Sequence, residues 1–158
     1  MAKYILEEML RVRNLRKDAA EKRLKQAQKL LDEAKQNLER AEEALEKFKV
    51  FIVEETDRLY KKIMMQKVKK GSVDELHYAI KVLKNKLVAH EQSVDAEKIN
   101  LEKAEKNLEQ KKLELQEANK NVEKIKSHKE EWMKESAKIE EMAADKELEE
   151  FAKKIKDA

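Results

Sequence analysis

Three histidines, His77, His90 and His128, are the side chains best suited to metal binding or general acid–base chemistry in this sequence. A helix that binds zinc through two histidines spaces them four residues apart, whereas His77 and His90 are thirteen residues apart. Cysteine is absent, which removes thiolate ligands and disulfides and is typical of a reducing compartment. The sequence has no HExxH motif, nucleophile elbow or glycine-rich phosphate loop. We therefore expect no catalytic residue, no metal site and no cofactor.

The composition predicts which elements must carry any functional side chain. The chain is 45% charged and 4% aromatic, with no proline and one glycine in 158 residues. It is rich in Ala, Leu, Glu, Lys and Gln, which are strong helix formers. This composition favours long helices, which enclose no cavity for a small-molecule substrate, so we expect a protein that is not an enzyme. The near-neutral net charge of +3 argues against nucleic-acid binding, and the short apolar runs argue against membrane insertion.

Hydrophobic residues recur every seven positions in both halves of the chain, which is typical of a coiled coil. We call the apolar interface that these positions predict between two helices the seam. In the first half it comprises Leu24, Leu31, Leu38, Leu45, Ile52 and Leu59, with Ala27, Ala34, Ala41, Phe48, Glu55 and Lys62. In the second half it comprises Ile80, Leu87, Val94, Leu101, Leu108, Leu115 and Val122, with Leu76, Leu83, His90, Glu97, Ala104, Lys111, Ala118, Ile125 and Trp132.

The single glycine lies between the two heptad arrays and predicts the turn. Gly71 could adopt the left-handed conformation that ends a helix, and Ser72 could cap the next helix, with Glu75 completing a capping box. The sequence thus predicts an all-α fold, a long antiparallel two-helix coiled-coil hairpin with a tight turn at Gly71–Ser72. We expect one domain over residues 1–158, with helices over about 3–70 and 73–156.

A turn centred near Gly71 also predicts a register between the helices. It places Phe48 opposite Val94, Ile52 opposite His90, and Leu10 opposite Trp132. In this register about the last 17 residues of the second helix extend beyond the start of the first helix.

Several apolar side chains near the turn fall outside the seam and are expected to be exposed, because a two-stranded coil covers only a narrow stripe. Exposed aromatic and methionine side chains often mark a surface that binds a partner. The alternative is that they pack on the edges of the seam and widen it. Trp132, the only tryptophan, similarly either plugs the wide end of the coil or contacts a partner.

Two stretches resemble a known family. MAKYILEEMLRVR at the amino terminus and HKEEWMKES over residues 128–136 look like the type III secretion stalk proteins of the YscO/FliJ family, and most of all their chlamydial member. Chain length, paired long helices and a near-central turn agree with that family along the whole chain.

The resemblance implies a function that composition does not. Members of the family are thought to insert the end with both termini into the hexameric secretion ATPase, and to reach the export-gate ring with the other end. They would couple ATP hydrolysis to protein export at the cytoplasmic face of the bacterial secretion apparatus, and secretion chaperones are further possible partners. The residues expected to bind the ATPase are Arg11, Arg13, Arg16, Trp132, Met133 and Lys134. Those expected to bind the export gate are Phe51, Val53, Tyr60, Met64, Tyr78 and Val82.

Two other functions are compatible with the same residues. One is a passive coiled-coil scaffold without a mechanical role. The other is a secretion chaperone that binds exported clients through its exposed apolar side chains.

Overall fold

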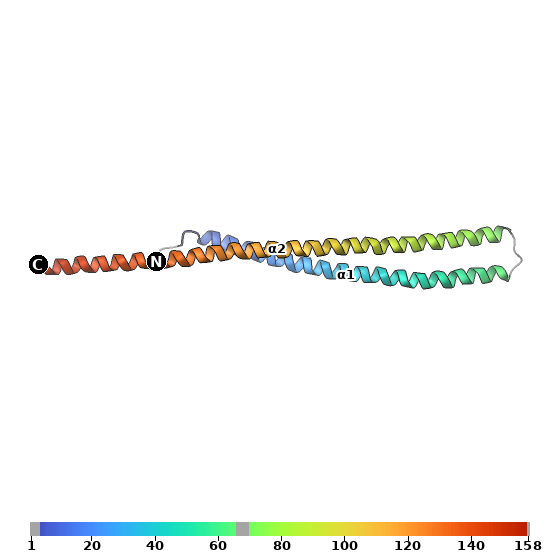
Figure 1. The fold of residues 1–158 in the computed structure, drawn as a ribbon, viewed down its shortest axis with the longest axis horizontal. Helices are drawn as coiled ribbons and strands as arrows, with labels where there is room; N and C mark the ends of the chain where they lie inside the picture. The colour runs from blue at the N-terminus through green and yellow to red at the C-terminus, as the bar shows by residue number, and fades with distance from the viewer. Residues whose placement is uncertain (1–3, 66–69, 158) are drawn as a thin grey trace. The chain divides into compact units, whose positions relative to one another are not determined.

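The structure is a computed structural model that describes residues 4–65 and 70–157, and it consists of two helices. Helix α1 spans Glu7–Met64 and helix α2 spans Lys70–Lys156. They pack antiparallel, and no strand occurs in the described part of the chain (Figure 1). The predicted all-α class and the antiparallel helical hairpin are therefore confirmed.

Charged residues at both ends of α1 and at the carboxyl-terminal end of α2 suit the helix dipoles. The first turn of α1 contains Glu7 and Glu8, and its last turn contains Lys61 and Lys62. Acidic side chains stabilise the positive amino-terminal end of a helix, and basic ones stabilise the negative carboxyl-terminal end. The last turn of α2 follows the same rule with Lys153, Lys154 and Lys156.

The predicted turn at Gly71–Ser72 is wrong. Helix α1 ends at Met64, before the expected residue 70, and Gly71 and Ser72 both lie inside the first turn of α2. Gly71 does not have a positive φ angle. The connection therefore involves Met65 and residues 66–69, which lie outside the described residues.

By its contacts the chain divides into two compact units, and each is described separately. The terminal unit comprises Met1–Lys25 and Gln110–Ala158, and the loop unit comprises Gln26–Glu109. Both units contain a piece of α1 and a piece of α2. The seam of each unit can therefore be compared with the heptad pattern.

In the loop unit the seam follows the predicted heptad positions. Each of them is buried or half-buried except Lys62, which is exposed, while the neighbouring Ile63 is half-buried. Small and large side chains alternate along this interface, which lets two helices approach closely without voids. The most buried members are Ala27, Leu31, Ala34, Leu76, Leu83, Val94 and Leu108.

The predicted register is wrong, because the contacts fit a register one heptad lower. In the terminal unit Arg13 bonds the backbone carbonyl of Asn121, eight residues before Lys129, which the predicted register places opposite Arg13. In the same unit Leu10 shares a buried cluster with Ile125, seven residues before its predicted partner Trp132. A heptad repeat allows two helices to slide past each other in steps of seven residues. The earlier turn selects the lower of these registers.

The polar seam residue Glu55 is held by Arg58 from the next turn of α1. The Arg58 Nε donates a hydrogen bond to Glu55 Oε2 at 3.0 Å, and a second bond joins the same two side chains. These hydrogen bonds hold the pKa of the Glu55 carboxyl below its usual range. The carboxylate therefore stays ionised at the edge of the seam.

Leu30 and Leu31 provide a matched test of the seam. Leu31 is 6% exposed, whereas its neighbour Leu30 is 46% exposed on the same helix. We expect Leu31→Ala to lower the free energy of unfolding by about 2–3 kcal/mol, because it removes buried methyl groups and leaves a void. Leu30→Ala should change it by less than about 0.5 kcal/mol. Chemical unfolding followed by circular dichroism measures both; equal losses would contradict the proposed seam.

Gly71 provides a test of the corrected turn. A Cβ atom at this position would meet nothing within 4 Å, and the backbone is helical. Gly71→Ala should therefore raise the free energy of unfolding by about 0.5 kcal/mol, since alanine is the better helix former. In a left-handed turn the same substitution would be strained. A fall in the thermal unfolding midpoint of Gly71→Ala would therefore contradict the helical position of Gly71 and support the turn at Gly71–Ser72.

Candidate functional site

An aromatic cluster anchors the start of the chain in the terminal unit. The Tyr4 side chain is only 6% exposed and packs in a core with Leu10, Val122 and Ile125. Its hydroxyl lies 2.6 Å from His128 Nδ1, and its ring centroid lies 5.2 Å from that of Trp132. We call Tyr4, His128 and Trp132 the clasp. It ties the segment before α1 to a part of α2 more than 120 positions away.

Charged groups flank the clasp. Lys129 Nζ lies 2.8 Å from Glu7 Oε2, which joins the first turn of α1 to α2. The same ammonium lies 6.0 Å from the centre of the Tyr4 ring, at the outer limit for a cation–π contact. Glu7 and Lys129 are both partly exposed, so we attribute the position of Tyr4 mainly to its apolar packing and less to this ion pair.

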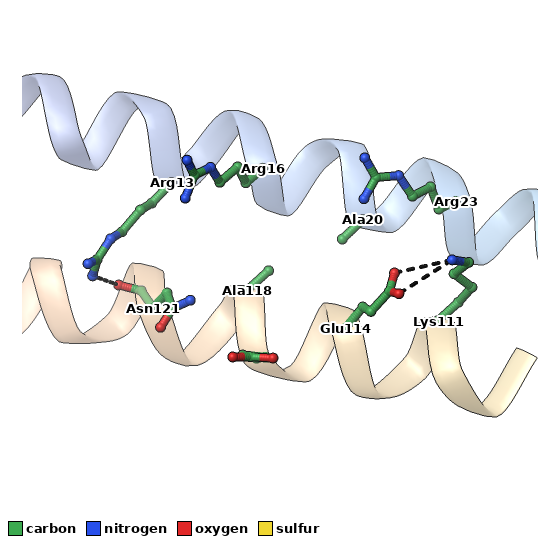
Figure 2. Close-up of a pocket in the computed structure, with 9 residues that line it drawn as sticks. Arg13, Arg16, Ala20, Arg23, Lys111, Glu114, Ala118 and Asn121 are labelled. Carbon is green, nitrogen blue, oxygen red and sulfur yellow. Dashed lines mark hydrogen bonds and ion pairs between the residues drawn. The ribbon is translucent and has the colours of Figure 1, made fainter.

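A groove of about 440 Å³ lies between the helices further along the terminal unit. Ala20 and Ala118 face each other across it, and their small side chains leave the space open (Figure 2). Arg13 reaches across and donates a hydrogen bond to the backbone carbonyl of Asn121 at 2.9 Å. We call this the basic groove, lined by Arg13, Arg16, Ala20, Arg23, Lys111, Glu114, Glu117, Ala118 and Asn121.

The charge of the basic groove suits a carboxylate-bearing partner. Four of its lining side chains are cationic and two are acidic, and one pair, Lys111 and Glu114, already interact at 3.4 Å. Arg16 and Arg23 are exposed, and neither guanidinium has a carboxylate partner among the described residues. Guanidinium groups bind carboxylates through two parallel hydrogen bonds, so these two are available to an incoming acidic group.

The structure separates the six residues that the sequence assigned to ATPase binding. Arg13 and Trp132 have internal contacts, because Arg13 bonds α2 and Trp132 packs on Tyr4. Arg11 forms an exposed ion pair with Glu8 at 3.4 Å, and Arg16 lines the basic groove. Met133 and Lys134 are exposed.

Sequence reasoning missed part of this site. Tyr4 and His128 were not singled out as a pair, and Arg23 and Lys111 were not placed beside Arg16. Tyr4 lies outside the heptad arrays, so only the unusual position of a tyrosine before the first helix could have drawn attention to it. Arg23 and Lys111 come together only in the correct register.

The residues assigned to export-gate binding lie in the loop unit and differ in exposure. Val82 is half-buried, and the ring of Phe51 lies 5.7 Å from that of the seam residue Phe48. Val82 therefore lies at the edge of the seam, as the alternative interpretation held, whereas Phe51 packs on a seam ring and is still 46% exposed. The other four are exposed and have no role in the seam: Val53, Tyr60, Met64 and Tyr78.

Three of these exposed residues belong to a pattern on α1. Val50, Val53, Tyr60 and Met64 recur at intervals of three, seven and four residues, which places them on one face of a helix. At about 100° per residue this face lies away from the seam positions Ile52 and Leu59. We call these four residues the outer stripe. Val50, 59% exposed, was missed, although its spacing from Val53 was visible in the sequence.

Neither helix, within the described part of the chain, carries a stretch long and apolar enough to cross a membrane. Among residues 4–65 and 70–157, no three His, Asp or Glu side chains gather closely enough to hold a metal ion. The features that the structure does show are an antiparallel seam, a basic groove and an exposed apolar stripe. They define a helical-hairpin protein whose recognisable surfaces suit contacts with other proteins.

The chain belongs to the YscO-like family, whose model matches residues 1–155. A YscO homologue from Chlamydia trachomatis, CT670, has a similar structure, with 31% identity, a TM-score of 0.78, and coverage of 97% of this chain and 94% of that one. The crystal structure of the type III secretion protein YscO from Vibrio parahaemolyticus matches with 25% identity, a TM-score of 0.88, and coverage of 93% and 92%. No curated protein matches the chain significantly. The family is one of bacterial type III secretion proteins and is not a known family of enzymes.

The clasp can be tested through Trp132, the only tryptophan and therefore a specific fluorescent reporter of this cluster. Tyr4→Phe keeps the buried ring but removes the hydroxyl that bonds His128, so we expect a loss of about 1 kcal/mol in the free energy of unfolding. Tyr60→Phe is the control, because Tyr60 is 48% exposed and lies in the loop unit. Urea unfolding followed by tryptophan fluorescence should separate the two variants; coincident curves would mean that the hydroxyl contributes nothing.

Proposed function

We propose that this protein is the central stalk of a type III secretion system, linking the hexameric secretion ATPase to the export gate and coupling ATP hydrolysis to protein export. It would act at the cytoplasmic face of the secretion apparatus. Membership of the YscO-like family supports the place in secretion. The observation that carries the two-partner assignment is that each compact unit exposes side chains that its own seam does not use.

The terminal unit is the proposed ATPase-binding part. Its exposed cations, Arg16 at the basic groove and Arg11 five residues earlier, offer guanidinium groups at one end of α1. Arginine binds carboxylates through two parallel hydrogen bonds, so binding depends on how the carboxylate is oriented. Such a surface therefore suits an acidic partner. Trp132 and Arg13 contribute indirectly, because they fix the helices that present these groups.

The loop unit is the proposed export-gate-binding part. Tyr60 is 48% exposed and Tyr78 is 71% exposed, and both lie away from the buried seam. Tyrosine is a typical anchor at protein interfaces because its ring buries a large area and its hydroxyl can still form a hydrogen bond. The outer stripe adds apolar area on α1 beside Tyr60.

The competing functions predict other partners. A passive scaffold should bind neither the ATPase nor the cytoplasmic domain of the export gate, and a secretion chaperone should prefer exported clients. A pull-down of the full chain against purified ATPase, gate domain and client proteins distinguishes the three functions.

Two sets of variants test whether the surfaces act separately. Tyr60→Ala combined with Tyr78→Ala should weaken gate binding about ten-fold or more, because removing an interface aromatic commonly costs about 1–2 kcal/mol. Arg11→Glu combined with Arg16→Glu should weaken ATPase binding and leave gate binding unchanged. Arg13 is kept in both variants, since its hydrogen bond to Asn121 is structural. Binding isotherms for both partners on both variants provide the measurement.

Helicity measured by circular dichroism must be unchanged in both variants, because all four side chains are exposed. The tyrosine variant should also stimulate the ATPase as the unaltered protein does. If each variant loses affinity for both partners equally, or if neither variant loses affinity for either partner, the assignment of one partner to each unit is wrong.

A further inference from the structure

The last part of α2 carries an apolar stripe that nothing in the described structure covers. Every residue from 137 to 157 is exposed, including Leu148 at 66%, Phe151 at 63% and Ile155 at 63%. Together with Ala144 they follow spacings of four, three and four residues, the spacing of a coiled-coil seam. We call Ala144, Leu148, Phe151 and Ile155 the tail stripe.

The tail stripe is not a continuation of the seam between α1 and α2. Steps of three and four residues from the half-buried Ser136 lead to Ile139 and Ala143, and then to the charged residues Lys146 and Glu150. At about 100° per residue, the tail stripe lies roughly a third of a turn around the helix from Trp132. The seam therefore loses its apolar character here while a new apolar face begins.

An uncovered helix of this kind calls for a partner. Most of the stability of a protein helix comes from packing of its apolar face, and isolated helical segments are only marginally stable in water. Leucine, phenylalanine and isoleucine on one face, each more than 60% exposed, therefore mark a surface for another helix.

The charges beside the tail stripe indicate which helix would pack against it. Residues 140–150 contain six acidic side chains and one basic one, whereas residues 153–156 contain three lysines. A second copy of the same segment matches this pattern only when it runs in the opposite direction. We propose that the tail stripe pairs antiparallel with the tail stripe of a second copy of this chain.

The pairing gives complementary layers and ion pairs. Leu148 of one copy would pack against Phe151 of the other, and the small Ala144 against the large Ile155, twice each by symmetry. Glu147 and Lys154, which flank the stripe on the same side, would then form two symmetric ion pairs between the copies. A parallel pairing instead sets Glu140 beside Asp145 of the other copy, which is repulsive.

Charge exchange at the flanking positions tests the proposal in the full chain. Four apolar layers make a small interface, so the dimer is weak and is measured by analytical ultracentrifugation into the millimolar range at low salt. Either Lys154→Glu or Glu147→Lys alone should weaken dimerisation about five-fold, since each replaces two attractive pairs by two repulsive ones. The double variant, which restores opposite charges, should recover the affinity of the unaltered chain.

Matched controls come from the opposite face of the same helix. Lys153→Glu and Glu149→Lys change the net charge identically, yet both lie away from the tail stripe. They should leave dimerisation nearly unchanged, whereas Leu148→Ala with Phe151→Ala should abolish it.

Three results would each overturn the proposal. The unaltered chain could stay monomeric at every concentration, the double variant could fail to recover the dimerisation affinity, or the control variants could lose as much affinity as the Lys154 and Glu147 variants.

Discussion

The apolar seam between α1 and α2 is the interaction on which the rest of this structure depends. Neither helix is apolar enough on the whole to be stable alone: the chain is 45% charged and its mean hydropathy is −0.92. Burial of residues such as Leu31, Val94 and Val122 supplies the main favourable term in both units. The axial register of the seam then determines which charged side chains of the two helices meet.

Because a narrow seam supplies the stability, most of the surface of each helix is free for other uses. In the terminal unit, alanines at positions 20 and 118 leave a groove that the surrounding arginines make basic. The clasp around Tyr4 holds the first turn of α1 beside this region, so exposed arginines are presented from a fixed helix. In the loop unit the outer stripe uses a face of α1 that has no part in the seam. These surfaces can therefore be altered without unfolding the chain.

The sequence predicted the seam well, because heptad spacing reports directly on which side chains one face of a helix presents. It did not predict the register, because a heptad pattern is satisfied equally well after one helix slides by seven residues. Placing the turn at Gly71 led to the wrong one of these registers. The sequence did not predict the clasp either. Tyr4 lies before the periodic segment, and its bond to His128 depends on the register rather than on any local pattern. The basic groove was not predicted; Arg13 and Arg16 were assigned to ATPase binding as neighbours in sequence, whereas Lys111 joins them only through the fold.

The central claim is that one chain holds two partners at once through two separate units, and a ternary complex tests it most directly. The full chain, the hexameric ATPase and the cytoplasmic domain of the export gate would be mixed and analysed by native mass spectrometry. The account predicts a species that contains the ATPase hexamer, a single copy of this chain and the gate domain together. Mutually exclusive binding, in which the gate domain displaces the chain from the ATPase, would contradict it.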